Sequence, residues 1–194
     1  MKNLIKFFES FLPNAWDKSN INTYNHSLTV AKAARTIASN TNTLSPEKAF
    51  LYGLMHDIGK FFLKNEEKYK HPRIGYELFS KEYNDIAEIC ITHPFPNLNI
   101  KSYHIYYCEG DVDEANKIDE ILSKLESNEY IELIQLCDKL SGLNSYMTIK
   151  AKFEWYKSNY LIEEKWVALN YEKLTKIKSK FDVLIKGEVY DLLL

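Results

Sequence analysis

The chain has 194 residues, which suffices for one sizeable hydrophobic core, and its apolar fraction of 45% is ordinary for a globular protein, so a second full domain is not expected. Its formal net charge of −2 gives no electrostatic case for general nucleic-acid binding, and no apolar run approaches the roughly 18 residues that span a bilayer. The three cysteines form no CxxC pair, which favours a reducing, cytoplasmic setting without a membrane partner.

Helical periodicity dominates the first half of the chain. The start is an amphipathic segment whose apolar side consists of Leu4, Phe7, Phe8 and Phe11. The stretch "HSLTVAKAARTIA" predicts a helix with one face formed by His26, Val30, Ala33 and Ile37. In "SPEKAFLYGLM", Ser45 is a good N-cap and Pro46 suits the first helical position. Residues 49–55 are apolar nearly all round, so we expect this helix to be central.

The second half also favours helices. "HPRIGYELFSKEY" predicts a short helix with Ile74 and Leu78 facing inward, and "NDIAEICITH" predicts another that ends at Pro94. Residues 95–118 are the least regular part and are interpreted as a long loop, with weak strand-like alternation at 103–108. "NEYIELIQLCDKLSGLNS" predicts a helix that stops near Gly142. From about residue 161, helical spacing connects Val167, Tyr171, Leu174, Ile177, Phe181 and Leu184. The fold class is therefore all-α.

Five separate segments each place a histidine or aspartate on the side expected to face the core. These residues are His26, His56, Asp57, His71, His93 and Asp138. A single core histidine is more often a hydrogen-bonded scaffold residue, and a single helix-face aspartate is more often paired or solvated. An unpaired buried carboxylate, however, costs on the order of several kcal/mol. Two carboxylates buried with four imidazoles are most readily reconciled if a cation lies between them.

The order of these residues resembles the HD-domain metal-dependent phosphohydrolase superfamily, and "HDIGK" is similar to the local form of its His-Asp doublet. His71 and His93 resemble two further histidines in the subset of that family that holds two metals. "HPRIGYELF" also resembles a segment of HD-GYP cyclic-dinucleotide phosphodiesterases. Where those enzymes continue with a double histidine and a Gly-Tyr-Pro signature, this chain has "ITHPFPN", so cyclic di-GMP is not assigned.

The resemblance implies a single-domain HD-type helical bundle over residues 1–194. Its core covers about residues 20–145, and an N-terminal helix (1–19) and C-terminal helices (146–194) pack on that core. It further implies two divalent metal ions, one held by His26, His56, Asp57 and Asp138 and the other by His71 and His93, with Asp57 bridging both. A carboxylate has two oxygens and can span two cations, whereas an imidazole cannot. Nitrogen and oxygen ligands without thiolate suit Fe, Mn, Co, Ni or Zn.

Three further residues are candidates for substrate binding. Lys60 follows the doublet and, by the resemblance, contacts a phosphate oxygen; alternatively it is a lysine in the last turn of a helix, which favours the helix dipole. Arg73 lies in a first helical turn, where a cation is poorly placed for the dipole, so it is either a phosphate ligand or an exposed side chain. His104 could position substrate or act as a general acid, although a solvated loop histidine is commoner.

The expected function is a cytoplasmic metal-dependent phosphohydrolase in which Asp57 and Lys60 are catalytic. It would cleave a phosphate ester or anhydride of a nucleotide-like small molecule through a water that bridges both metals and is acidified by them. Dinucleoside polyphosphates are a subclass suggested by analogy with small HD proteins. Two alternatives stay open. A mixed-valent di-iron oxygenase would consume oxygen and show a di-iron EPR signal, and a non-catalytic metal-retaining HD ligand-binding domain would bind without product.

Overall fold

The computed structural model describes residues 2–11, 18–100, 110–159 and 164–194. In these ranges every regular element is a helix, and the β structure is an isolated bridge between Ser141 and Tyr146, which confirms the all-α prediction. The helices of the first half are α1 (Lys2–Glu9), α2 (Lys18–Ser39), α3 (Pro46–Met55), α4 (His71–Phe79) and α5 (Asn84–Thr92). Those of the second half are α7 (Val112–Leu122), α8 (Glu129–Leu140), α9 (Ile149–Asn159), α10 (Glu164–Ile185) and α11 (Val189–Leu193).

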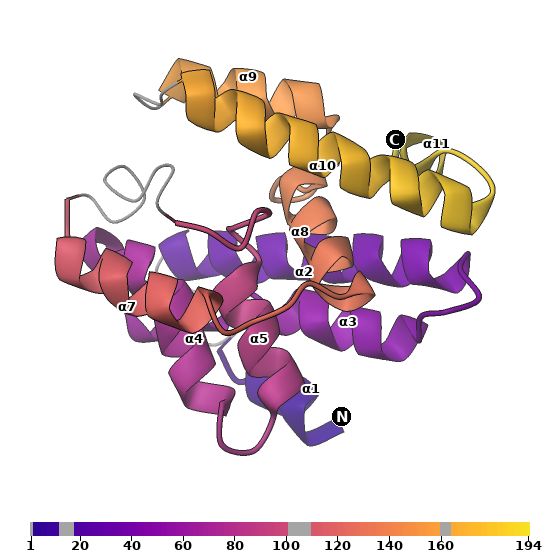
Figure 1. Cartoon of the computed structure of the whole chain (residues 1–194). Coiled ribbons are helices and arrows are strands. Elements are labelled where there is room, and N and C mark those ends of the chain that lie inside the picture. Colours follow the sequence, from indigo (N-terminus) through magenta and orange to yellow (C-terminus); the bar gives the residue numbers. More distant parts are fainter. Residues whose placement is uncertain (1, 12–17, 101–109, 160–163) are drawn as a thin grey trace.

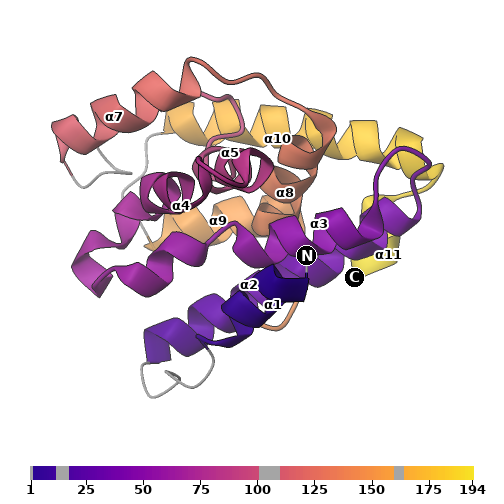
Figure 2. The same cartoon turned by 90° about the horizontal axis from the view of Figure 1, so that it is seen from below.

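Helices α2 and α3 run side by side (Figures 1 and 2). Helix α3 begins as its sequence predicts, because the Ser45 side chain accepts a hydrogen bond from the Lys48 amide and Pro46 occupies the first turn. Gly53 allows the two helices to touch, since a Cβ atom there would lie 2.5 Å from the Cα of Ala31. The apolar residues of α3 are therefore central, as expected.

Helix α8 forms the middle of the molecule, between α2–α3 and the C-terminal pair α9–α10 (Figure 1). It is buried on nearly all sides, and Gln135 is one of its buried polar residues. The Gln135 amide donates hydrogen bonds to the backbone carbonyls of Thr92 (2.9 Å) and Phe95 (3.2 Å), just where α5 ends. This contact fixes the C-terminal end of α5 against α8, and both helices carry predicted metal ligands.

Both flanking parts of the chain contact this bundle. Phe8 of α1 stacks on Tyr24 with ring centroids 4.9 Å apart, and Phe181 of α10 is fully buried in the core that α10 shares with α8. The assignment of residues 1–194 to one domain is not tested by these contacts and stays a prediction. None of the described helices is long and apolar enough to cross a membrane.

Two predictions of inward-facing residues are wrong. Leu78 is exposed and Ile74 is only partly buried, because the inward face of α4 is formed by His71, Gly75 and Phe79. Gly75 decides this: a Cβ there would lie 2.8 Å from the Cβ of Cys90, so α4 and α5 pack almost backbone to backbone. In α10, Tyr171 is likewise exposed while the neighbouring Asn170 is buried.

The loop predicted for residues 95–118 is wrong in its second part, because α7 begins at Val112. The Asp111 side chain accepts a hydrogen bond from the Glu114 amide (3.0 Å), which is N-capping, and the buried residues Ala115 and Ile118 follow at helical spacing. The acidic first turn of α7 also favours a helix start. The alternation at 103–108 lies outside the described residues.

Candidate metal centre

The predicted metal ligands meet where α2, α3, α4, α5 and α8 come together. Five of them are buried: His56, Asp57, His71, His93 and Asp138. His26 of α2 is partly buried, with 15% of its side chain exposed. The donor atoms form two groups in which all distances are within 4.8 Å. The first group is His26, His56 and Asp57, and the second group is Asp57, His71 and His93.

Asp57 belongs to both groups and turns one oxygen toward each. Its Oδ2 lies 3.5 Å from Nε2 of His56. Its Oδ1 lies 3.0 Å from Nε2 of His71 and 3.3 Å from Nε2 of His93. This is the arrangement that a bridging carboxylate requires, with one oxygen available to each of two cations.

Asp138, in the last turn of α8, joins the first group. Its Oδ1 lies 2.9 Å from Nε2 of His26 and 3.8 Å from Nε2 of His56. His26 and Asp138 are 112 residues apart in sequence, so their contact depends on the packing of α2 against α8. The first group therefore comprises two imidazoles and two carboxylates.

Each of the four imidazoles presents Nε2 to the centre because a backbone carbonyl holds its other nitrogen. A carbonyl oxygen can only accept, so Nδ1 must carry the hydrogen and Nε2 keeps its lone pair. The distances from each Nδ1 to the backbone oxygen that accepts its hydrogen bond are as follows: 2.7 Å from His56 to Gly53, 2.6 Å from His71 to Lys68, 2.9 Å from His93 to Cys90 and 3.0 Å from His26 to Gly142.

Three of these histidines lie at helix ends, which explains the pattern. His56 and His93 follow the last residues of α3 and α5, and His71 follows the 3₁₀ helix η3 (Asn65–Lys70). The last carbonyls of a helix lack intrahelical partners. An imidazole at the end reaches back to the carbonyl three residues earlier, satisfies it and is oriented by it.

Two buried polar atoms at the centre have the chemistry of cation ligands. His56 Nε2 and Asp57 Oδ1 are inaccessible to solvent and have no hydrogen-bond partner in the part of the chain that the structure describes. Buried polar atoms without partners are rare because each loses its hydration without compensation. A metal ion between the donors would compensate both atoms, so the residues present fit a metal site on their own chemistry.

The protonation states also suit metal binding. Burial lowers the pKa of His56 to about 3, and it lowers the pKa values of His71 and His93 as well. Burial opposes ionisation of Asp57, but the Lys60 ammonium together with His56 and His71 outweighs it and holds the pKa of that carboxyl well below its usual range. For Asp138 burial is likewise outweighed, here by Lys139 together with His26 and His56, and its pKa is lowered. Neutral imidazoles and ionised carboxylates are the forms that bind metals.

A comparison with known families decides the assignment. A family model described as the HD domain matches residues 23–143, more than half of the chain. The chain belongs to the HD-domain family. Searches of curated proteins and of solved structures returned no match. Membership in this family indicates the superfamily of metal-dependent hydrolases, whose members bind divalent metals, and the two ligand groups are consistent with it. The matched segment lies within the 20–145 core that the sequence resemblance predicts.

Lys60 of the HD domain lies beside the Asp57 carboxylate, which the two donor groups share. Its Nζ is 2.6 Å from Oδ2 of Asp57, and 27% of its side chain is exposed. It lies in the last turn of the 3₁₀ helix η2 (Ile58–Phe62), which follows α3, so the alternative interpretation as a lysine in a last helical turn also describes its position. Gly59 lets η2 approach α4 this closely, because a Cβ there would lie 2.2 Å from the backbone oxygen of His71. Lys60 thus sits at the rim with its ammonium on an oxygen of a candidate metal ligand.

The other two substrate-binding candidates differ from Lys60. Arg73 Nε contacts both carboxylate oxygens of the buried Glu114 of α7 (2.7 and 2.9 Å), and its Nη1 contacts Glu77 (2.6 Å). Its guanidinium therefore joins α4 to α7 and is neutralised there, which gives it a role that the sequence did not indicate. A role in substrate binding stays a prediction for Arg73. His104 lies outside the described residues.

Two lysines near the first ligand group were missed by the sequence analysis. Lys139 pairs with Oδ2 of Asp138, and Lys152 of α9 donates a hydrogen bond to the backbone oxygen of Ser141 (3.2 Å). Lys139 directly follows a predicted ligand, so its position was a usable signal. Lys152 offered no such signal, because only the fold brings α9 to this end of α8.

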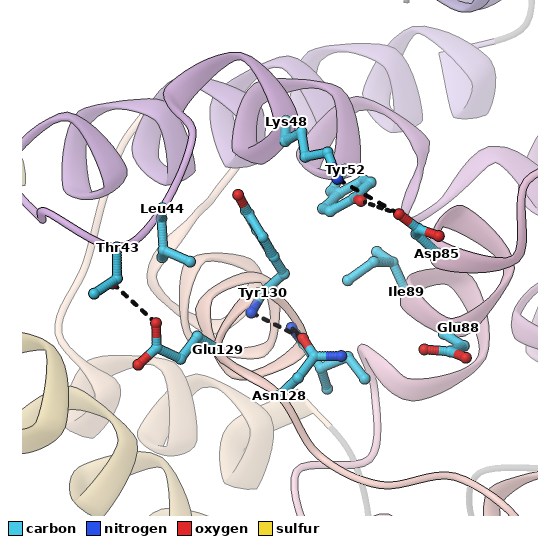
Figure 3. A pocket seen from close by; sticks show the side chains of 11 residues that line it. Thr43, Leu44, Lys48, Tyr52, Asp85, Glu88, Ile89, Asn128, Glu129 and Tyr130 are labelled. Atoms are coloured by element: carbon cyan, nitrogen blue, oxygen red, sulfur yellow. Dashed lines mark hydrogen bonds and ion pairs between the residues drawn. The ribbon is translucent and has the colours of Figure 1, made fainter.

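A cavity lies at the opposite end of α3 from the His/Asp centre and has a different character (Figure 3). It has a volume of about 400 Å³, and its lining includes Lys48, Tyr52, Asp85 and Tyr130. The Tyr52 hydroxyl donates to Asp85 (2.9 Å), and Lys48 lies 3.7 Å from the same carboxylate. Its lining includes none of the predicted metal ligands, so the candidate site is the His/Asp centre.

Proposed function

We propose that this HD-domain protein is a two-metal phosphohydrolase that cleaves a phosphate ester or anhydride of a nucleotide-like small molecule in the cytoplasm. One observation carries the proposal above the others. The two oxygens of the buried Asp57 face two separate groups of imidazoles, at 3.5 Å on one side and at 3.0 and 3.3 Å on the other. A structural site needs one closed ligand set, whereas two adjacent sets with few protein ligands leave positions for a substrate.

The ligand sets define how the cations would be held. His26, His56, Asp57 and Asp138 would hold one divalent ion, and Asp57, His71 and His93 would hold the other. Bound there, two divalent ions supply an acidified water and polarise a phosphoryl oxygen. Nitrogen and oxygen donors are compatible with Fe, Mn, Co, Ni or Zn.

The residues around the ligands support this chemistry. Asp57 stays ionised because its pKa is lowered, so it keeps both groups together near neutral pH. Its partner Lys60 is partly exposed and sits at the rim, where its ammonium can turn from the carboxylate to a phosphate oxygen. The second group is closed to solvent, which strengthens electrostatic interactions within it.

The test is an activity panel on protein purified without chelator and loaded with Fe or Mn. Nucleoside phosphates, dinucleoside polyphosphates and cyclic dinucleotides are incubated separately, and phosphate or nucleotide products are measured. The control is Asp57→Asn, which keeps the side-chain shape but removes one bridging oxygen and the charge. Turnover well above this control supports the proposal, and turnover equal to the control contradicts it.

The same samples separate the alternatives. Substrate-dependent oxygen uptake together with a di-iron EPR signal would replace the proposal by an oxygenase. Tight ligand binding without any product would replace it by a non-catalytic binding domain.

A further inference from the structure

Lysines from three different elements gather beside the first ligand group. Lys60 comes from η2, Lys139 from α8 and Lys152 from α9. The first two contact the ligand carboxylates Asp57 and Asp138, respectively. Lys152 contacts the Ser141 carbonyl, just beyond the α8 turn that carries Asp138. The HD-domain match ends at residue 143, so Lys152 is contributed by a part of the chain that the family model does not include.

Lys152 is held in place by a short, well-bonded connection between α8 and α9. Gly142 N donates to Ser145 O (2.7 Å), and Met147 N donates to Leu140 O (2.8 Å), which closes the turn. Helix α9 is then anchored by the buried Phe153, which packs against Trp166 of α10. The position of Lys152 relative to the metal centre is therefore set by backbone contacts and by core packing.

The surroundings of Lys152 are unusual for a lysine. Among the described residues no carboxylate lies within ion-pair distance of its ammonium; the contacts are the Ser141 carbonyl and the faces of Trp155 (5.7 Å) and Tyr156 (5.6 Å). Burial is the main cause that lowers the pKa of Lys152. Asp138 and Asp57 oppose this effect, while the cations Lys139 and Lys60 add to it. A half-buried ammonium that has no carboxylate within ion-pair distance and lies close to two other lysines is a site that an anion would stabilise.

The summed charge of the centre, with two divalent cations bound, indicates how many phosphate groups that anion carries. Two divalent cations more than cancel the charges of Asp57 and Asp138, and Asp57 Oδ2, the oxygen that Lys60 contacts, is one that a cation would take. The lysine ammoniums would then face an excess of positive charge. One phosphate group carries at most two negative charges and can be held at the metals. A second, linked phosphate is the group that would reach the lysines.

We propose that Lys152, with Lys60 and Lys139, binds a second phosphate group of the substrate, and that the protein therefore prefers molecules with at least two linked phosphates over monophosphate esters. This inference rests on the proposed phosphohydrolase function and names the substrate class of the same site. Lys152 is in this view a specificity-determining residue supplied by α9, and the alternative role is purely structural, as a cap for the Ser141 carbonyl.

The experiment compares Lys152→Met with a matched control on the same helix. Lys150→Met also removes one lysine of α9, but 76% of that side chain is exposed and its nearest charged partner is Glu154 at 3.9 Å. Binding of inorganic tripolyphosphate and of inorganic phosphate to the metal-loaded proteins is measured by calorimetry, and metal content and thermal stability are recorded. Because this readout needs no turnover, it remains informative if the proposed hydrolase activity fails.

The expected result is a loss of about tenfold or more in tripolyphosphate affinity for Lys152→Met, the size of one lost charge-assisted hydrogen bond. Phosphate affinity, metal content and the affinities of Lys150→Met should stay unchanged, and Lys152→Arg should retain most of the binding. If turnover is found, KM for a nucleoside triphosphate should rise with little change in kcat. Equal affinities of Lys152→Met and the parent protein for tripolyphosphate, or equal losses for phosphate and tripolyphosphate, would overturn the proposal.

Discussion

The two ligand groups share Asp57 but differ in how they are built and how open they are. The first group joins His26 of α2 to Asp138 of α8, and these side chains are 15% and 12% exposed. The second group joins His71 of α4 to His93 of α5, whose side chains are 8% and 3% exposed. The first group, here called the open group, has lysines beside it. The second group, here called the closed group, is surrounded by packed helices.

This difference separates two tasks within one centre. The closed group lies where α4 and α5 touch, so its geometry follows from core packing around Gly75 and Cys90. The open group lies near the turn that connects α8 to α9, and Lys139 and Lys152 lie beside it. We infer that a substrate approaches from the side of the first group and that the second group is reached only through it.

The largest effect on metal content and activity is expected from substituting Asp57, the residue that both groups share. Asp57→Ala removes the oxygens that both groups share, so metal content should fall from two ions per chain to none and activity by about a thousandfold or more. Elemental analysis of protein purified without chelator measures this. Asp85→Ala, which removes a carboxylate from the cavity at the other end of α3, should leave both metals bound. Retention of two metals by Asp57→Ala would show that the groups do not share a bridge.

A smaller effect is expected when only the closed group is changed. His93→Ala removes one imidazole of the second group, while the four donors of the first group remain. Metal content should fall from two ions per chain to one, with activity reduced by about a hundredfold. The matched change His26→Ala should weaken the other ion. If either variant lost both ions completely, the division into two groups would have to be abandoned.

A stability effect is expected from the packing that supports the closed group. Gly59→Ala places a Cβ 2.2 Å from the backbone oxygen of His71, so η2 and α4 must move apart. We expect a loss of about 2 kcal/mol or more in the free energy of unfolding. Gly187→Ala is the control, because the nearest atom to its added Cβ is 4.0 Å away, and it should shift stability by less than about 0.5 kcal/mol. Denaturant titration compares them, and equal stabilities would contradict the close contact.

The smallest effect near neutral pH is a proton linkage that involves both groups. The pKa of His56 is about 3 in the folded protein, below the ordinary 6.5, so between these values the unfolded chain binds more protons. The free energy of unfolding of the metal-free protein should therefore fall as pH falls from about 6.5 toward 3. The lowered pKa values of His71, His93, Asp57 and Asp138 act in the same direction. Chemical denaturation at pH 7, 6 and 5 tests this.

The variant His56→Gln provides the comparison for that titration, since it removes the group with the stated shift. Its stability should depend less steeply on pH over the same range. A parent protein that became more stable on acidification would contradict the neutral, buried state of the imidazole.

Three of the candidate ligands, His26, His93 and Asp138, could be predicted from sequence because each lies in register with an apolar helix face. His93 follows Ile86, Ile89 and Cys90 at helical spacing, and such a face must point to the core wherever the helix packs. The face of α4 could not be fixed in the same way. Its periodicity allowed Ile74 and Leu78 to point inward, and the contact between Gly75 and α5 decided otherwise.

The polar contacts between segments distant in sequence could not be predicted either, because they too depend on how the helices pack. Arg73 meets Glu114 across 41 residues, and Lys152 reaches Ser141 only because the α8–α9 turn folds back. Charged residues have no periodic requirement that would reveal a partner. The start of α7 was different, since Asp111 and the acidic first turn were visible signals that the interpretation as a loop passed over.

The backbone carbonyls that hold the imidazoles have a consequence for how this protein can change. Because the acceptor of each Nδ1 belongs to the main chain, no replacement of a neighbouring side chain can delete it. Elsewhere, a carboxylate that orients a metal-bound histidine can be lost by one substitution. Here side-chain substitutions cannot remove the groups that orient the imidazoles, because that orientation depends on where the helices end. Lys60, Lys139 and Lys152 could therefore be substituted to accommodate new substrates while the imidazole Nε2 atoms keep their orientation toward the centre.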